Sequence, residues 1–123
     1  MNYFERPPLD LAAIAAHLSL KPHTERLENM VQKLDAQQLN QALEKIPQWK
    51  LEGGKLVREW TFPDFVAAMA FVNRVAGQAE AANHHPDIDI RYNRVTLGLV
   101  THDSGGITAK DAAMAAIIDQ YSS

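Results

Sequence analysis

The sequence predicts an α+β fold in which a four-stranded antiparallel sheet carries its helices on one face. Two observations predict this fold. Between residues 35 and 121 the hydrophobic spacing is that of a helix, a hairpin, a helix, a hairpin and a helix, in that order. Both strand-like segments are pairs of short runs joined by turn residues, and two hairpins joined by a helix form an antiparallel sheet covered on one side.

The first helix of this series begins with a capping box. Asp35 stands at the cap position and Gln38 follows three residues later, so each side chain can accept a hydrogen bond from the other residue's backbone. Four apolar residues then recur at helical spacing, namely Leu39, Ala42, Leu43 and Ile46. Pro47 ends the segment.

Each hairpin is predicted from alternating residues on both sides of a short turn. The first covers residues 49–62 and turns at Gly53-Gly54. The second covers residues 88–102 and turns at Asn93-Arg94, which leaves Tyr92 on its first strand. In that strand Tyr92 is expected to pack rather than to take part in chemistry.

The helix between the hairpins has the strongest apolar pattern in the chain. It opens at Pro63-Asp64 and must stop by His85, because Pro86 disfavours α geometry in the residue before it. Its predicted apolar stripe consists of Phe65, Met69, Val72, Ala76 and Ala79.

The chain is expected to contain an N-terminal helical extension, residues 1–34, and a domain, residues 35–123. Asp10 and Thr24 can cap two short helices in the extension, the second carrying Leu34. The domain ends in a helix that Thr108 and Asp111 can cap and that runs through Tyr121.

Composition limits the function classes. The 123 residues are 46% hydrophobic and 22% charged, which is ordinary for one globular domain. The net charge of −3 gives no basic excess for binding nucleic acid or an anionic membrane. The absence of cysteine excludes disulfides, thiolate metal cages and a cysteine nucleophile.

The N-terminal apolar run at residues 11–16 is far shorter than the ~20 residues of a membrane span. With no basic segment before it that would mark a secretory signal, we expect a cytoplasmic protein.

Three of the five histidines surround the second hairpin: His84, His85 and His102. Glu80 lies one helical turn before His84, and a helix C-terminus favours a protonated ring. The hairpin brings the end of its second strand near the start of its first, so the three rings can converge. Histidines are suited to proton transfer near neutral pH.

The residues alone leave two other interpretations open. Histidines at a helix end are more often capping or solvated side chains than catalytic ones. Three histidines with Glu80 or Asp111 would also be enough ligands for zinc or iron. The spacing is not that of a His-Glu-x-x-His helix, and adjacent histidines seldom bind one ion together, so the sequence favours no metal.

The run Glu80-Ala81-Ala82-Asn83-His84-His85-Pro86, followed by Tyr92, His102 and Asp111, resembles the signature of the pterin-4a-carbinolamine dehydratase family. Further runs that look like family sequence are Phe62-Pro63-Asp64-Phe65, the segments 71–76, 78–80 and 92–95, Thr101-His102-Asp103, and Trp49. The resemblance covers about residues 35–121. Mammalian members also serve as dimerisation cofactors of a homeodomain transcription factor.

The resemblance implies a hydro-lyase that removes water from 4a-hydroxytetrahydropterin and gives quinonoid dihydropterin, in the recycling of tetrahydropterin for aromatic amino-acid hydroxylases. It implies no cofactor and a homodimer or homotetramer, which the four-stranded sheet's exposed edges and the small residues of the last helix also favour. The alternative is a non-catalytic relative of the same fold, a protein-binding module or an assembly factor for Rubisco. A metal-dependent hydrolase is a third class.

By resemblance, His84 and His102 are general acids on opposite faces of the pterin, and His85 binds the ring and assists as a base. Four further residues would bind substrate or support the site. Glu80 would orient a histidine or hydrogen-bond the pterin, Asp111 would act through His102, Pro86 would fix the chain, and Trp49 would pack near the pterin or in the core.

Overall fold

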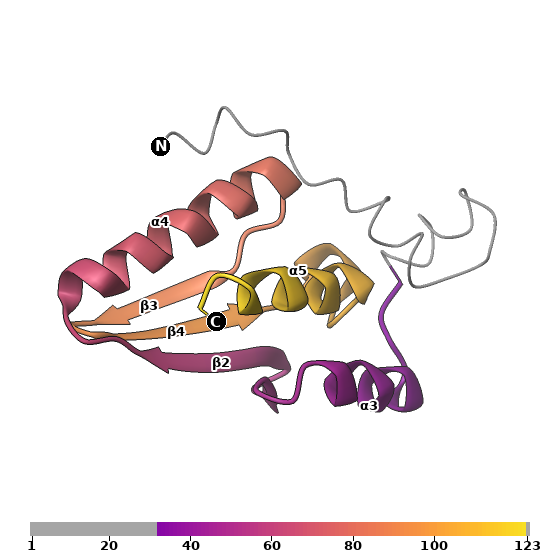
Figure 1. Ribbon diagram of the computed structural model, residues 1–123. Helices are drawn as coiled ribbons and strands as arrows, with labels where there is room; N and C mark the ends of the chain where they lie inside the picture. Colours follow the sequence, from indigo (N-terminus) through magenta and orange to yellow (C-terminus); the bar gives the residue numbers. More distant parts are fainter. Residues whose placement is uncertain (1–31, 123) are drawn as a thin grey trace.

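The computed structural model describes residues 32–122 (Figure 1). Its elements are α3 (Ala36–Lys45), β1 (Lys50–Glu52), β2 (Lys55–Thr61), α4 (Phe65–Ala82), β3 (Asp87–Arg91), β4 (Arg94–Leu99), the short 3₁₀ helix η2 (His102–Ser104) and α5 (Ala109–Asp119). Helices and hairpins alternate in the predicted order, and the α+β fold is confirmed. No helix in this part of the chain is long and apolar enough to cross a membrane.

The four strands form one antiparallel sheet in the order β1-β2-β4-β3. Each hairpin contributes one central and one edge strand, and β2 joins β4 in the middle with Trp60 opposite Val95. Because the central strands are paired on both sides, their side chains supply the sheet's part of the core. The edge strand β3 is exposed along its whole length.

The core lies between one face of the sheet and the helices. Alternate residues of the central strands are buried, namely Leu56, Trp60, Val95, Leu97 and Leu99. The helices cover them with Phe71 and Val75 from α4 and Met114 and Ile118 from α5, and the rings of Trp60 and Phe71 lie 4.8 Å apart. Fully burying one such side chain is worth about 1.5–3 kcal/mol. The opposite face of the sheet carries polar side chains such as Glu59 and Thr96.

The beginning of α3 is as the sequence predicted. Asp35 Oδ1 accepts from the Gln38 backbone N–H at 2.8 Å, and Gln38 Oε1 accepts from the Asp35 N–H at 3.0 Å. The preceding segment is joined to the domain, since the Leu34 N–H donates to the Ile107 carbonyl at 2.8 Å. Leu34 is therefore not helical, contrary to the sequence prediction. Residues 1–31, which hold the rest of the two expected N-terminal helices together with His17 and His23, lie outside the described residues.

The apolar stripe predicted for α4 is confirmed at Val72 and Ala79 and is wrong at Phe65, which is 47% exposed. The buried face of the helix is formed by Ala68, Phe71, Val72, Val75, Gln78 and Ala79. Nearly every residue in the first two turns is apolar, so the sequence pattern does not distinguish the buried face from its neighbours. The helix begins as predicted, with Asp64 Oδ1 accepting from the Ala67 N–H at 2.8 Å.

The turn of the second hairpin lies one residue earlier than predicted. Arg91 pairs with Arg94, so the two turn residues are Tyr92 and Asn93, and Tyr92 has a positive φ of 52°. Its side chain is 66% exposed, so the prediction that Tyr92 packs on a strand is wrong for this chain. β4 also ends at Leu99 instead of reaching His102, which begins η2.

Candidate active site

The end of α4 positions the two adjacent histidines. Asn83 adopts the left-handed conformation with φ 51°, and its N–H donates to the carbonyls of Ala79 and Glu80. The His84 N–H donates to the Ala79 carbonyl at 3.1 Å, which completes a Schellman motif. Asparagine tolerates this conformation better than most residues. The reversal buries His84 and leaves His85 exposed.

His84 meets a buried carboxylate from another helix. Its Nε2 lies 2.6 Å from Oδ1 of Asp111, the third residue of α5. The Asp111 side chain has no exposed surface and His84 is 8% exposed. Two further donors meet Oδ2 of Asp111, namely the Thr101 hydroxyl at 2.8 Å and the Thr108 N–H at 2.9 Å. A buried carboxylate with this many donors is satisfied as an anion.

Glu80 pairs with His85. Its Oε2 lies 2.5 Å from Nε2 of His85, and both side chains are more than half exposed. Helical spacing had placed Glu80 on the face of His84. The helix ends at Ala82, however, and the reversal at Asn83 brings the second histidine back over Glu80. An exposed pair of this kind orients a side chain but contributes little to stability.

His102 lies at the same end of the sheet as His84. Asp87 of β3 is paired with Gly98 of β4, so the chain before β3 and the chain after β4 leave the sheet side by side. His102 is exposed as the first residue of η2, where its carbonyl accepts from the Gly105 N–H at 3.0 Å. Within residues 32–122, no hydrogen bond joins its ring to the other two histidines.

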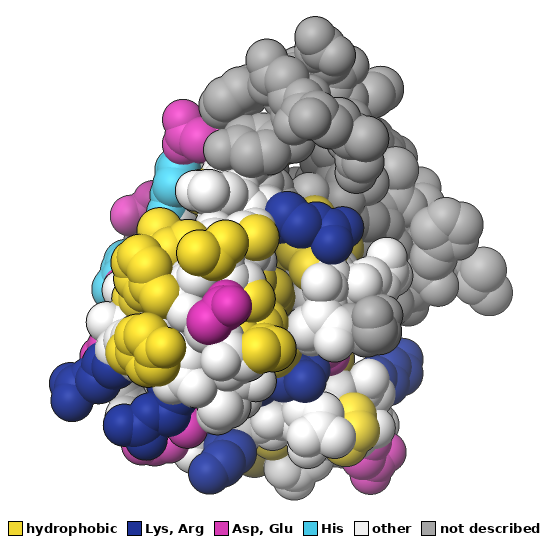
Figure 2. Space-filling model, turned by 60° about the vertical axis from the view of Figure 1, so that its left-hand side comes forward, with side chains coloured by type: hydrophobic (Ala, Val, Ile, Leu, Met, Phe, Trp, Pro, Cys, Tyr) yellow, Lys and Arg dark blue, Asp and Glu magenta, His cyan; other side chains and the backbone are white. Residues whose placement is uncertain are grey.

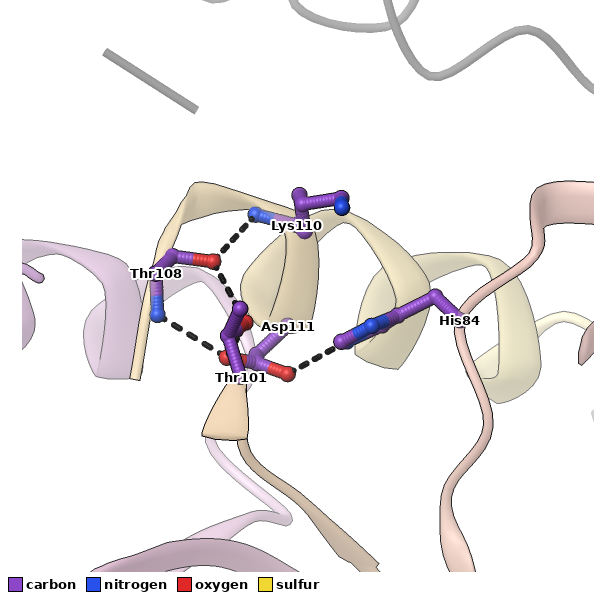
Figure 3. A network of polar contacts seen from close by, with 5 residues as sticks. All are labelled: His84, Thr101, Thr108, Lys110 and Asp111. Atoms are coloured by element: carbon purple, nitrogen blue, oxygen red, sulfur yellow. Dashed lines mark hydrogen bonds and ion pairs between the residues drawn. The ribbon is translucent and has the colours of Figure 1, made fainter. Parts of the chain in front are cut away.

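Asp111 contacts a different histidine from the one expected. The sequence predicted that it acts through His102, but its carboxylate lies against His84 because the first turn of α5 faces the end of α4 (Figure 3). His102 is related to the carboxylate only through its neighbour Thr101.

Pro86 and Trp49 differ in their relation to the site. Pro86 is half-buried between His85 and β3. Trp49 is 3% exposed in the core, and its indole N–H donates to Asp119 at 2.8 Å. Asp119 is eight residues beyond Asp111, or about 12 Å along the axis of α5. Of the two places considered for Trp49, the structure shows the core.

The arrangement offers two kinds of imidazole for proton transfer. His84 is held in one orientation by a buried anion, whereas His85 and His102 are exposed. Both adjacent histidines follow the C-terminus of α4. In the described part of the chain, no group of three or more potential ligands is placed to hold a metal ion.

Sequence reasoning did not identify Thr101 as part of the site. It stands in a run similar to family sequence, but nothing in its spacing links its hydroxyl to Asp111. The link arises because Thr101 pairs with Gly106 in an isolated bridge, which folds the loop back so that Thr101 and Thr108 lie side by side. The sequence did predict the capping box of Thr108 and Asp111, which the structure confirms.

Comparison with known proteins gives matches over the whole described domain. The family model described as Pterin 4 alpha carbinolamine dehydratase matches residues 32–121. A protein of Acidobacterium capsulatum, provisionally named a pterin-4-alpha-carbinolamine dehydratase, is 55% identical over 87 residues, which are 71% of this chain and 95% of that protein. A protein of Trichodesmium erythraeum with the same provisional name is 46% identical over 93 residues, covering 76% of this chain and all of that protein.

Two solved structures share the fold. The transcriptional coactivator/pterin dehydratase of Brucella melitensis superposes with a TM-score of 0.71 at 32% identity, over 74% of this chain and 99% of that one. A pterin dehydratase-like protein identified as a RuBisCO assembly factor in the alpha-carboxysome gives a TM-score of 0.50 at 22% identity, over 59% of this chain and 84% of that one. The second likeness is one of fold alone.

Proposed function

Because this chain belongs to the pterin-4a-carbinolamine dehydratase family, we propose that it is a hydro-lyase that converts 4a-hydroxytetrahydropterin into quinonoid dihydropterin and water. The observation that carries the proposal is the buried pair of His84 and Asp111. A histidine held by a buried carboxylate at the same end of the sheet as two exposed histidines is suited to delivering and removing protons.

The proposed reaction moves protons and breaks one carbon–oxygen bond. The hydroxyl oxygen on C4a takes up a proton and leaves as water. The N5–H loses its proton, and its electron pair forms the double bond between N5 and C4a. No electrons pass to or from another molecule, so the reaction as proposed requires no redox cofactor. Its proton transfers are assigned to histidine side chains, so the proposal includes no metal ion.

The residues divide this work according to their surroundings. His84 and His102 act as general acids from opposite faces of the pterin, with His84 held by Asp111. His85 binds the ring and assists as the base that takes the N5 proton, and Glu80 orients it. Pro86 fixes the chain between His85 and β3.

The substrate class indicates the reaction that precedes this one. A 4a-hydroxytetrahydropterin is the pterin product of aromatic amino-acid hydroxylases, so the proposed role is recycling of that product in the cytoplasm. The test is to add the protein to a phenylalanine hydroxylase assay and to follow the decay of the 4a-hydroxy intermediate. Faster decay supports the proposal, and an unchanged rate at protein concentrations above those of the intermediate contradicts it.

We also propose that the chain forms a homodimer or homotetramer. Large hydrophobic side chains are exposed at the start of α4 and on the β3–β4 hairpin, namely Phe65, Val66, Ile88, Ile90 and Tyr92. The Phe62 N–H donates to the Asn93 carbonyl at 2.8 Å, which holds these two regions together. Figure 2 shows hydrophobic side chains gathered on one face of the molecule. Ala113 and Ile117 of α5 are already buried, so the surface for association is expected on α4 and β3.

A further inference from the structure

A chain of hydrogen bonds enters Asp111 from the side opposite His84 (Figure 3). The Lys110 N–H donates to the Thr108 hydroxyl at 3.2 Å, the hydroxyls of Thr108 and Thr101 lie 2.8 Å apart, and the Thr101 hydroxyl donates to Asp111 Oδ2 at 2.8 Å. We call these residues, together with His84, the Asp111 network. Thr101, Thr108 and Asp111 are all buried.

The direction of each bond in this network is fixed. A hydroxyl has one hydrogen, and that of Thr101 is given to Asp111. The bond between the two threonines must then be donated by Thr108, whose oxygen is free to accept from the Lys110 N–H. Every hydrogen on this side therefore points toward the carboxylate.

The same reasoning extends to the ring of His84. An ionised carboxylate only accepts, so the atom 2.6 Å from Oδ1 must carry a hydrogen, and that atom is Nε2. Among the described residues, nothing hydrogen-bonds to Nδ1 of His84. The second nitrogen of the ring is thus the one left for another molecule.

We propose that Thr101 and Thr108 are positioning residues that act through Asp111 to hold His84 with its hydrogen on Nε2, so that Nδ1 is the atom that exchanges a proton with the substrate. The role in proton exchange rests on the proposed dehydratase function. The placement of the hydrogen does not, because it follows from the Asp111 network alone. Thr101 touches no reacting atom in this scheme and acts only through the carboxylate.

Asparagine at position 111 provides a discriminating variant. The Thr108 backbone N–H is a fixed donor beside Oδ2, so it selects the amide oxygen of an asparagine for that place. The amide NH₂ then faces Nε2 of His84, and two donors cannot share one hydrogen bond. Asp111→Asn is therefore expected to move the hydrogen of neutral His84 from Nε2 to Nδ1.

The measurement is long-range ¹H–¹⁵N NMR on protein labelled with ¹⁵N-histidine, under alkaline conditions that keep the ring neutral. The signals of His84 are those missing from His84→Gln. We expect Nε2–H in the unmodified chain and Nδ1–H in Asp111→Asn. Asp119→Asn, the same change on the same helix away from His84, should leave the Nε2–H form in place. Nδ1–H on His84 in the unmodified chain overturns the proposal, whatever Asp111→Asn shows.

Kinetics test the part played by Thr101. Asp111→Asn should lower kcat by about 100-fold or more with a smaller change in KM, the loss expected when a histidine is held in the wrong tautomer. Thr101→Val should lower kcat about tenfold, the cost of one hydrogen bond to a charged group, and Thr101→Ser should restore it. The double variant Thr101→Val with Asp111→Asn should be no slower than Asp111→Asn alone. If the fold-losses in kcat of the two single variants multiply in the double variant, Thr101 does not act through Asp111.

The two proposals fail in different ways. If the hydrogen moves as expected in a protein that does not accelerate dehydration, the dehydratase function is wrong and the Asp111 network stands as a property of the fold. If an active protein carries the hydrogen on Nδ1, the function stands and the positioning role is wrong.

Discussion

The indole N–H of Trp49 donates to Oδ1 of Asp119, which joins the chain just before the first hairpin to the last residue of α5. The same oxygen accepts from Nη1 of Arg58 at 2.6 Å, and the Arg58 guanidinium lies 4.5 Å from the ring centroid of Trp60. The Asp119 carboxylate therefore links α5 to β2 and to the residue before β1, at the end of the domain away from His84.

Removal of this carboxylate is expected to destabilise the fold and to spare the site. Asp119→Ala leaves the buried indole N–H of Trp49 without its acceptor, which should lower the free energy of unfolding by about 2 kcal/mol. Urea denaturation followed by tryptophan fluorescence measures this change. Asp119→Asn keeps an acceptor oxygen and should cost less. Equal stability of Asp119→Ala and the unmodified chain would contradict the prediction.

Loss of either proposed general acid is expected to slow dehydration. His84→Ala or His102→Ala removes one proton donor, which typically lowers the catalysed rate about 10²–10⁴-fold. The observed rate cannot fall below that of the uncatalysed dehydration. The double variant should approach the uncatalysed rate in the coupled hydroxylase assay. Asp89→Ala, a change at an exposed position of β3, is the control and should keep full activity. A double variant with undiminished activity would refute the assignment of both acids.

His85 is expected to affect substrate binding more than turnover. If it mainly binds the ring, His85→Ala raises KM more than it lowers kcat. Because the pair with Glu80 is exposed, the same variant should change the free energy of unfolding by no more than about 0.5 kcal/mol. Initial rates over a range of pterin concentrations separate the two constants. A large fall in kcat at constant KM would make His85 the principal proton-transfer residue instead.

A charge on the exposed apolar surface is expected to disrupt association. Light scattering should give a dimer or tetramer for the unmodified chain, and Val66→Asp should give a smaller species. Val66 is 76% exposed, so this substitution should not disturb the fold of one chain. Gln41→Asp, at an exposed position of α3, is the control for added charge. A monomeric unmodified chain would rule out the oligomer.

Activity is expected to survive removal of metal ions. The proposed chemistry uses only histidine and carboxylate groups, so prolonged treatment with a chelator should leave the dehydration rate unchanged. Elemental analysis of the purified protein should find no metal in stoichiometric amount. Loss of activity that returns on addition of one divalent ion would favour a metal-dependent reaction.

The parts of the fold that depend on neighbouring residues could be predicted from the sequence. The caps at Asp35 and Thr108, the start of α4 after Pro63-Asp64 and the Gly53-Gly54 turn each depend on a few adjacent residues, and all four are confirmed. The buried face of α4 could be predicted only in part, because its first two turns are apolar on every side. Tertiary packing, such as that of Phe71 against Trp60 and Phe62, distinguishes one face from another.

The candidate site shows the same limit. The histidines and both acids could be named from the sequence, but their pairing could not. Glu80 meets His85 because of the left-handed turn at Asn83, and Asp111 meets His84 because α5 begins beside the end of α4. The second contact joins residues 27 positions apart, and no local pattern fixes which side chains meet over such a separation.

The orientation of the His84 ring depends on the capping box at the start of α5. Asp111 is both the residue that closes the box with Thr108 and the partner of His84, so the first turn of α5 cannot unwind without releasing the imidazole. Helix termini open at lower free energy than the centre of a sheet. We therefore expect the ring to lose its fixed orientation on heating while β2 and β4 are still paired, so that the proposed reaction fails at a lower temperature than the one at which the domain melts.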